Sequence, residues 1–211
     1  IPDFMKKAII STIPKSGSKF VLKNERGIFV LSAMRTLFMR LIYNTKSNII
    51  DNNMSDSNVG GRKKRSSLNH IFIINGIIHE TISSKLNTPV NLQVYDYKQM
   101  FDSMNLEESI SDLYDSGIKD DTLALIYKAN TNIKVKVKTP YGLSAETRLE
   151  KTVLQGDTWG PTMAANQVDT LGKQLLIENP DYLYKYKGHV PIGILGMIDD
   201  IVGVSENGIH A

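Results

Sequence analysis

Two adjacent aspartates between apolar runs have the clearest potential for chemistry. Asp199 and Asp200 separate two short Ile- and Val-rich runs within residues 192–205. Runs of this length flanked by glycines are typical of buried strands joined by a tight turn, so the segment predicts a β-hairpin. Two anions at its tip repel each other and resist desolvation, which favours a bound cation. A solvated Asp-Asp turn is the alternative that this stretch alone leaves open.

Asp96 supplies a third carboxylate in a similar setting. Residues 90–97 alternate in the manner of a strand, which ends at Asp96. If this strand neighbours the hairpin, three carboxylates converge at one sheet edge. Mg²⁺ prefers oxygen ligands, and two such ions about 4 Å apart can stabilise the attacking and leaving oxygens of an in-line phosphoryl displacement. Because no paired His or Lys is available as a base, the pattern favours nucleotidyl transfer over hydrolysis.

Composition excludes several other classes of site. The chain has 211 residues and no cysteine, so it can form a sizeable core but no disulfide framework or Cys-based zinc site. Its four histidines lack metal-ligand spacing. No apolar run reaches the length of a membrane span, so we expect no membrane partner. The chain begins without Met, and we expect it to be an excerpt of a longer polypeptide.

Hydrophobic periodicity predicts a mixture of helices and strands. Helices are expected at 28–43, 66–86, 106–116, 119–129 and 161–178, and strands near 90–97, 132–138, 143–149 and 182–186. Residues 3–13 are expected to be a short helix end that runs into a strand. The polar segment 44–60 predicts a flexible loop. Residues 132–138 place three lysines on one strand face, which either discourages strand aggregation or follows a phosphate backbone. The basic run 61–65 is a phosphate contact, a nuclear localisation signal or a solvated loop.

Five segments in order resemble the motifs of reverse transcriptases, particularly of the non-LTR retrotransposon type. They are Ile13-Pro-Lys-Ser-Gly with Asn24-Glu-Arg-Gly-Ile, Val59-Gly-Gly-Arg-Lys-Lys-Arg-Ser, Val94-Tyr-Asp-Tyr-Lys-Gln-Met-Phe-Asp-Ser, Leu154-Gln-Gly-Asp, and Met197-Ile-Asp-Asp. The last stands where the family usually has Tyr-Ala-Asp-Asp. The resemblance covers nearly the whole chain.

The resemblance implies an α+β fold: the fingers and palm of the polymerase right hand, with an antiparallel palm sheet backed by helices. Fingers would occupy residues 1–90, including the loop at 44–60. The palm would occupy 91–211, with a fingers-side insertion at about 118–150 and the thumb missing. The activity implied is RNA-directed DNA polymerisation by a retroelement enzyme. Its partners would be an RNA template, a DNA or RNA primer and dNTPs, and its location intracellular, nuclear or cytoplasmic.

The resemblance also assigns roles to individual residues. Asp96, Asp199 and Asp200 would be catalytic and would hold two Mg²⁺ ions, with Mn²⁺ as an alternative. The substrate contacts would come from Lys15, Arg26, Tyr97, Phe101, Gln155 and Gly156, and the template contacts from Arg62, Lys63 and Arg65. Among these, Lys15 and Arg26 would reach the triphosphate, where cations offset developing charge. Phe101 would lie under the sugar and exclude a 2′-hydroxyl.

Two alternative functions remain at this point. An RNA-dependent RNA polymerase shares the palm, but the ring of Phe101 argues against a ribonucleotide site. A catalytically inactive, domesticated nucleic-acid-binding scaffold would have no need to keep three anions near a phosphate backbone. The chain departs from the family at Met197 and Ile198, at Gly27 where a proline is usual, and at residues 157–160.

Overall fold

The chain folds into two compact units that interleave along the sequence. The computed structural model describes residues 1–14, 24–83, 90–97 and 100–206. The first unit contains residues 1–50 and 101–160, and the second contains 51–100 and 161–211. This division differs from a single boundary at residue 90, because residues 51–90 lie with the second unit. Residues 101–160 lie with the first unit, and the fingers-side insertion at about 118–150 stays a prediction.

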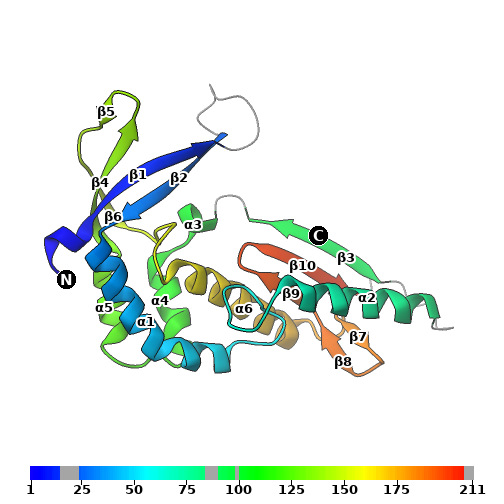
Figure 1. Cartoon of the computed structure of the whole chain (residues 1–211). Coiled ribbons are helices and arrows are strands. Elements are labelled where there is room, and N and C mark those ends of the chain that lie inside the picture. Colours follow the sequence, from blue (N-terminus) through cyan, green and yellow to red (C-terminus); the bar gives the residue numbers. More distant parts are fainter. Residues whose placement is uncertain (15–23, 84–89, 98–99, 207–211) are drawn as a thin grey trace. The chain divides into compact units, whose positions relative to one another are not determined.

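The first unit is built around a mixed sheet that can be followed in Figure 1. Its elements are η1 (Asp3–Lys6), β1 (Lys7–Pro14), β2 (Glu25–Leu31), most of α1 (Ala33–Asn53), α3 (Met100–Ser103) after its first residue, α4 (Leu106–Asp115), α5 (Thr122–Ala129), β4 (Thr131–Thr139), β5 (Gly142–Leu143) and β6 (Thr147–Lys151). The strand order is β2-β1-β4-β5, with β6 also on β4, and β1 runs parallel to β4. Ile133 and Val135 of β4 are buried with Ala8 and Leu154, as the alternation predicts.

Helix α1 replaces much of the predicted flexible loop. The helix continues to Asn53, so residues 44–53 are helical and the prediction of a loop over 44–60 is wrong for this part. The segment contains no Gly or Pro to end the helix, and Ile50 anchors it at 2% exposure.

The predicted start of that helix is also wrong. Residues 28–31 belong to β2, where Phe29 pairs with Ile10 of β1. Leu37 and Leu41, farther along the same predicted helix, are 57% and 58% exposed. The pairing with β1 is non-local, and it overrides the helical spacing of the apolar residues.

The second unit contains an antiparallel sheet backed by helices, as predicted. Its elements are α2 (Ser67–Ser83), β3 (Asn91–Asp96), α6 (Gly160–Glu178, whose first residue belongs to the first unit), β7 (Tyr184–Tyr186), β8 (Val190–Ile192), β9 (Ile194–Met197) and β10 (Asp200–Ser205). The three-stranded sheet has the order β3-β10-β9, and β7 pairs with β8. Leu195 and Val204 form a core with Ile77 of α2. Gly196, on the other face, lies against Val168 of α6.

None of the helices within the described residues is both long and apolar enough to cross a lipid bilayer.

Candidate active site at the edge of the three-stranded sheet

The sheet brings the predicted carboxylates to one edge. Asp96 is the last residue of β3 and Asp200 the first of β10, and the two are directly paired in the antiparallel register. Side chains at paired positions point to the same face with their Cβ atoms about 4.5–5.5 Å apart. Asp199 precedes Asp200 in the turn from β9. The spatial convergence expected from the sequence is therefore present, while the chemical roles of these residues stay predictions.

The turn that carries Asp199 has an unusual backbone. Only Ile198 and Asp199 separate β9 from β10, and Ile198 has a φ of 61°. Positive φ at the first central residue is the pattern of a type II′ hairpin turn, where glycine is usual. A β-branched residue in this region costs on the order of 1–3 kcal/mol and persists only where the surrounding structure holds it. The turn therefore needs external support.

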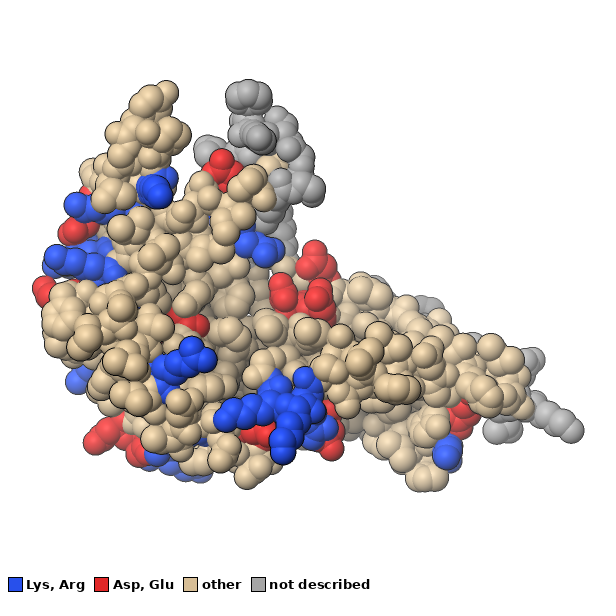
Figure 2. Space-filling view, viewed as in Figure 1, with Lys and Arg blue, Asp and Glu red and all other residues tan. Residues whose placement is uncertain are grey.

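Among the described residues, the charges at this edge have no protein counter-ions. Asp96 and Asp200 are exposed and Asp199 is partly exposed, and none of the three forms an ion pair with another residue in the described part of the chain. Acidic side chains gather in Figure 2 at the place where the β9–β10 turn lies in Figure 1. Like charges at directly paired positions destabilise a sheet. A bound cation would relieve this repulsion.

The carboxylates fit a hard divalent ion whose coordination shell is completed by other ligands. Within the described residues, no group of three or more acidic or histidine side chains is arranged so that it could hold a metal ion by itself. Mg²⁺ is commonly bound through one or two carboxylates, with water and substrate phosphates completing its shell, and it does not need a cage made only of protein. The pair of Asp96 and Asp200 with Asp199 beside it offers this kind of partial ligand set.

The face that carries the carboxylates is open next to them. Met197 is paired with Asp200 and is 39% exposed, and Val94, two residues before Asp96, is 80% exposed. Both side chains lie on the face shared by Asp96 and Asp200, because side chains two apart on a strand point the same way. Met197 stands where the resembling family has tyrosine. The carboxylates thus border an exposed apolar surface that could support a substrate.

The other predicted substrate residues are distributed over the two units. Tyr97 directly follows Asp96 and is 40% exposed. Four of these residues lie in the first unit: Arg26, Phe101, Gln155 and Gly156. Arg26 is an exposed residue of β2, and Phe101 is a half-buried residue of α3. Lys15 lies outside the described residues.

The loop with Gln155 and Gly156 is fastened to β2. The backbone N–H of Phe29 donates a hydrogen bond of 3.1 Å to the carbonyl of Gln155. Gly156 has a φ of 110°, and a Cβ at this position would lie 2.9 Å from the carbonyl oxygen of Phe29. Both features require glycine here. The structure therefore gives the Gln-Gly pair a fixed backbone position within the first unit.

A buried ion pair that sequence reasoning missed holds the same loop. Arg35 Nη2 lies 2.6 Å from Asp157 Oδ2, with the side chains 1% and 2% exposed. Arg35 also donates to the carbonyl of Ala129 and, at 3.1 Å, to Asn130 Oδ1. Residues 157–160 were noted only as a departure from the family, and they serve as anchors. The sequence signal for this pair is Arg35, a charged residue among the apolar residues of a helix. Its partner Asp157 lies 122 residues away, so no local pattern identifies the pair.

Trp159 forms the second anchor of this loop. The side chain is fully buried, its Nε1 donates a hydrogen bond of 3.3 Å to the carbonyl of Met39, and Tyr43 packs edge-on with ring centroids 5.2 Å apart. Edge-to-face aromatic pairs contribute about 0.5–1.5 kcal/mol beyond burial. The loop that carries Gln155 is thus tied to α1 at two points.

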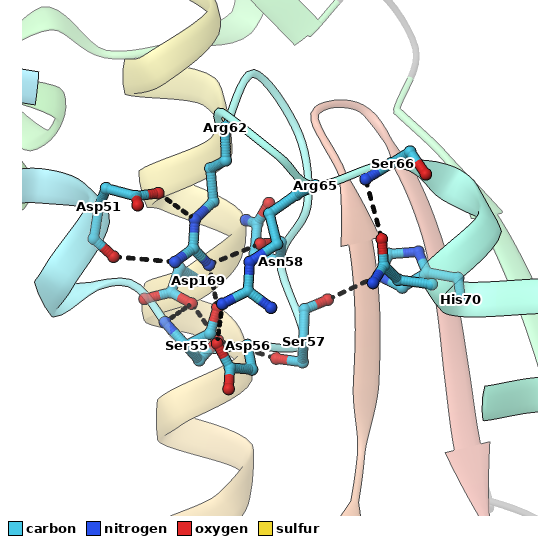
Figure 3. Close-up of polar contacts among 11 residues, drawn as sticks. Asp51, Ser55, Asp56, Ser57, Asn58, Arg62, Arg65, Ser66, His70 and Asp169 are labelled. Carbon is cyan, nitrogen blue, oxygen red and sulfur yellow. Dashed lines mark hydrogen bonds and ion pairs between the residues drawn. The ribbon is translucent and has the colours of Figure 1, made fainter. Parts of the chain in front are cut away.

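Two arginines of the basic run 61–65 form ion pairs within the protein. Arg62 is 6% exposed, and its guanidinium binds Asp51 Oδ1 at 2.6 Å and the carbonyls of Ser55 and Asn58 at 2.5 and 2.8 Å, as Figure 3 shows. Arg65 pairs with Asp56 at 2.5 Å. Lys63 is exposed. This geometry gives Arg62 an internal role, and the template contacts predicted for this run stay predictions.

Comparisons with known proteins show similarity at the level of structure only. No family model and no curated protein matches the sequence. The telomerase from Candida tropicalis in complex with the TWJ fragment of telomeric RNA superposes with a TM-score of 0.64 at 13% identity, covering 99% of this chain and 37% of that chain. The apo telomerase from Candida tropicalis truncated from the C-terminal domain gives 0.59 at 17%, covering 99% and 45%.

A third solved structure agrees with these two. Telomerase from Candida albicans in complex with the TWJ fragment gives a TM-score of 0.58 at 12% identity, covering 99% of this chain and 38% of that chain. The chain thus spans less than half the length of these telomerases. Identities this low show the fold alone, and that fold is reverse-transcriptase-like, of the polymerase right-hand kind.

Proposed function

We propose that the chain carries the nucleotidyl-transfer centre of an RNA-directed DNA polymerase, a reverse transcriptase of a non-LTR type of retroelement. The observation that carries the proposal is the pairing of Asp96 with Asp200, with Asp199 in the adjoining turn, on a reverse-transcriptase-like fold. The neighbouring telomerase structures that contain telomeric RNA support an RNA partner. A nuclear or cytoplasmic location belongs to the same proposal.

The reaction assigned to this edge is extension of a primer. The primer 3′-hydroxyl attacks the α-phosphate of a dNTP, a new phosphodiester bond forms, and pyrophosphate leaves. Asp96, Asp199 and Asp200 would hold Mg²⁺, or Mn²⁺ in its place. Two such ions would supply Lewis-acid stabilisation of the attacking and leaving oxygens. The fixed β3–β10 register presents the carboxylates without rearrangement during the reaction.

The remaining residue roles follow the family resemblance and stay proposals. Lys15 and Arg26 would bind the triphosphate, and the backbone at Tyr97 would contact the metal or triphosphate. Phe101 would exclude a 2′-hydroxyl. The fastened loop with Gln155 and Gly156 would contact the nucleotide and template strand. Lys63 and Arg65 would contact the template backbone, whereas Arg62 would hold its own segment, which begins at Ser55. The first unit would be the fingers and the second the palm.

One other function has a specific observation in its favour. Three solved structures with this fold are telomerases, so a telomerase is the second candidate. It shares the proposed chemistry and differs in its template. An RNA-dependent RNA polymerase and an inactive scaffold are disfavoured, by Phe101 and by the retained carboxylates respectively.

The test is primer extension on an RNA template by the full-length natural polypeptide. We expect incorporation of dNTPs that needs Mg²⁺, stops with EDTA and discriminates against NTPs. Preferential NTP incorporation would identify an RNA polymerase, and nucleic-acid binding without any incorporation would identify a scaffold. Extension of a telomeric primer only with a dedicated repeat template would favour the telomerase alternative.

A further inference from the structure

We propose that residues 55–62, here named the clamp loop, position the Asp199–Asp200 turn through a backbone contact between Gly60 and Ile198. The consequence for catalysis rests on the proposed function, whereas the contact itself does not. The sequence leaves the basic run 61–65 open as a phosphate contact, a nuclear localisation signal or a solvated loop. The structure gives Arg62 of this run a different task, as part of the clamp loop.

The clamp loop covers the outer edge of β9. The N–H of Val59 donates a hydrogen bond of 3.0 Å to the carbonyl of Gly196, and the N–H of Gly196 donates one of 2.9 Å to the carbonyl of Ser57. Asn58 and Gly196 therefore form a parallel bridge. Both free backbone groups of Gly196, one residue before Met197, are satisfied by this loop. An edge strand that is paired in this way is held in register up to its last residue.

Several buried polar contacts fix the clamp loop to its own unit. Asn58 is 1% exposed, its Nδ2 donates to the carbonyl of Ala165 in α6 at 2.5 Å, and its Oδ1 accepts the N–H of Gly60 at 3.0 Å. The N–H and hydroxyl of Ser55 both donate to Asp169 Oδ1 on the same helix. Buried groups with satisfied partners of this kind rigidify a segment.

Arg62 closes the clamp loop on itself. Its guanidinium joins Asp51 at the end of α1 to the carbonyls of Ser55 and Asn58, so one planar group ties the start and the middle of the loop together (Figure 3). A forked guanidinium makes such multiple bonds, whereas a lysine ammonium offers a point charge. His70 of α2 adds a contact of 3.0 Å to the carbonyl of Ser57.

Gly60 brings this rigid loop against the turn. A Cβ placed on Gly60 would lie 2.8 Å from Ile198 Cγ1, closer still to the Ile198 nitrogen, and 3.1 Å from the carbonyl carbon of Met197. No side chain fits there without displacing the turn. The backbone of the clamp loop therefore abuts the residue whose φ of 61° is unfavourable for isoleucine. We infer that this contact maintains the turn and, through it, the positions of Asp199 and Asp200.

The first test compares Gly60→Ala with Gly172→Ala as the matched control. Gly172 lies in α6 of the same unit, and its added Cβ would meet the Cβ of Ile194, the first residue of β9, only at an ordinary 3.8 Å. NMR amide shifts of Gly196, Ile198 and Asp199, and Mn²⁺ binding followed by EPR, are read without any need for activity. We expect Gly60→Ala to shift these amides and weaken Mn²⁺ binding about tenfold, as loss of support for metal ligands does.

In primer extension, the same change should lower kcat about 100-fold, as a misplacement of about 1 Å can, with the KM for primer–template unchanged. Gly172→Ala should match the wild type in every measurement. Unchanged amides and Mn²⁺ binding in Gly60→Ala would overturn the inference. If the wild type shows no primer extension but Gly60→Ala still shifts the amides of the turn, the proposed function is refuted. The inference that the clamp loop positions the turn is then still supported.

If Gly60→Ala does not fold, a double-mutant cycle of Arg62 and Ile198 tests whether the clamp loop acts on the turn. Ile198→Gly allows the turn its positive φ without external support, because glycine is favoured at this position of a type II′ turn. Arg62→Ala should weaken Mn²⁺ binding in the parent but by less than about threefold in the Ile198→Gly background. Equal losses in both backgrounds would show that Arg62 stabilises the fold without acting on the turn.

Discussion

The buried pair of Arg35 and Asp157 offers a prediction that can be worked from the structure. Asp157→Ala removes the carboxylate 2.6 Å from Arg35 Nη2 and leaves a guanidinium that is 1% exposed with two neutral acceptors, the carbonyl of Ala129 and the side chain of Asn130. Breaking a buried pair on one side costs about 3–5 kcal/mol, because the remaining charge is uncompensated. The two surviving hydrogen bonds place the expected loss at the lower end, about 3 kcal/mol.

The assay is urea denaturation of the chain, with the free energy of unfolding taken from the midpoint and slope. Asp3→Ala is the matched control, since Asp3 makes an exposed pair with Lys134 in the same unit, and such surface pairs contribute about 0–1 kcal/mol. Asp157→Asn keeps an acceptor and should fall between the two. Equal losses for Asp157→Ala and Asp3→Ala would refute the claim that this ion pair holds the loop after Gln155.

Three further predictions concern other parts of the chain. Phe101→Val should raise the use of ribonucleotides relative to deoxynucleotides by about tenfold or more in single-nucleotide incorporation, and an unchanged ratio would remove Phe101 from the sugar site. Gly156→Ala should lower the free energy of unfolding by about 1–3 kcal/mol more than Gly142→Ala, because both have positive φ but only Gly156 has a carbonyl 2.9 Å from its added Cβ; equal losses would refute the contact. Burial lowers the pKa of His70 below its ordinary 6.5, so the unfolded chain binds more protons, and stability that is complete above pH 6.5 should decline as the pH falls through that value. His70→Gln should remove this part of the decline in denaturation midpoints between pH 8 and 5, whereas identical pH profiles would contradict it.

The elements that the sequence predicted well are those set by local patterns. The alternation before Asp96, the alternating lysines of β4, and the short apolar runs around Asp199 each define a strand within a few residues, and the structure has strands there. The convergence of Asp96 and Asp200 could be anticipated because both lie at strand ends, and neighbouring strands of one sheet share an edge.

The features that escaped prediction depend on contacts between distant residues. Phe29 fits a helical stripe, but pairing with β1 makes it a strand residue. The interleaved units arise from tertiary contacts that no local pattern encodes. Arg62 looked like a solvated or phosphate-binding cation, because the carbonyls that it binds carry no signal in the sequence. The support for the turn was hidden for the same reason: the close contact of Gly60 with Ile198 involves mainly backbone.

The most direct test of the central claim is RNA-templated primer extension by the full-length polypeptide carrying Asp96→Asn, beside Asp181→Asn, an exposed aspartate of the same unit. The charge removed is the same in both, and each variant is first shown to unfold at the temperature of the wild type. Loss of a carboxylate that holds catalytic metal should lower the rate about 1,000-fold, corresponding to about 4 kcal/mol of transition-state stabilisation. The account predicts this loss for Asp96→Asn and a wild-type rate for Asp181→Asn. Extension by Asp96→Asn at the wild-type rate would contradict it.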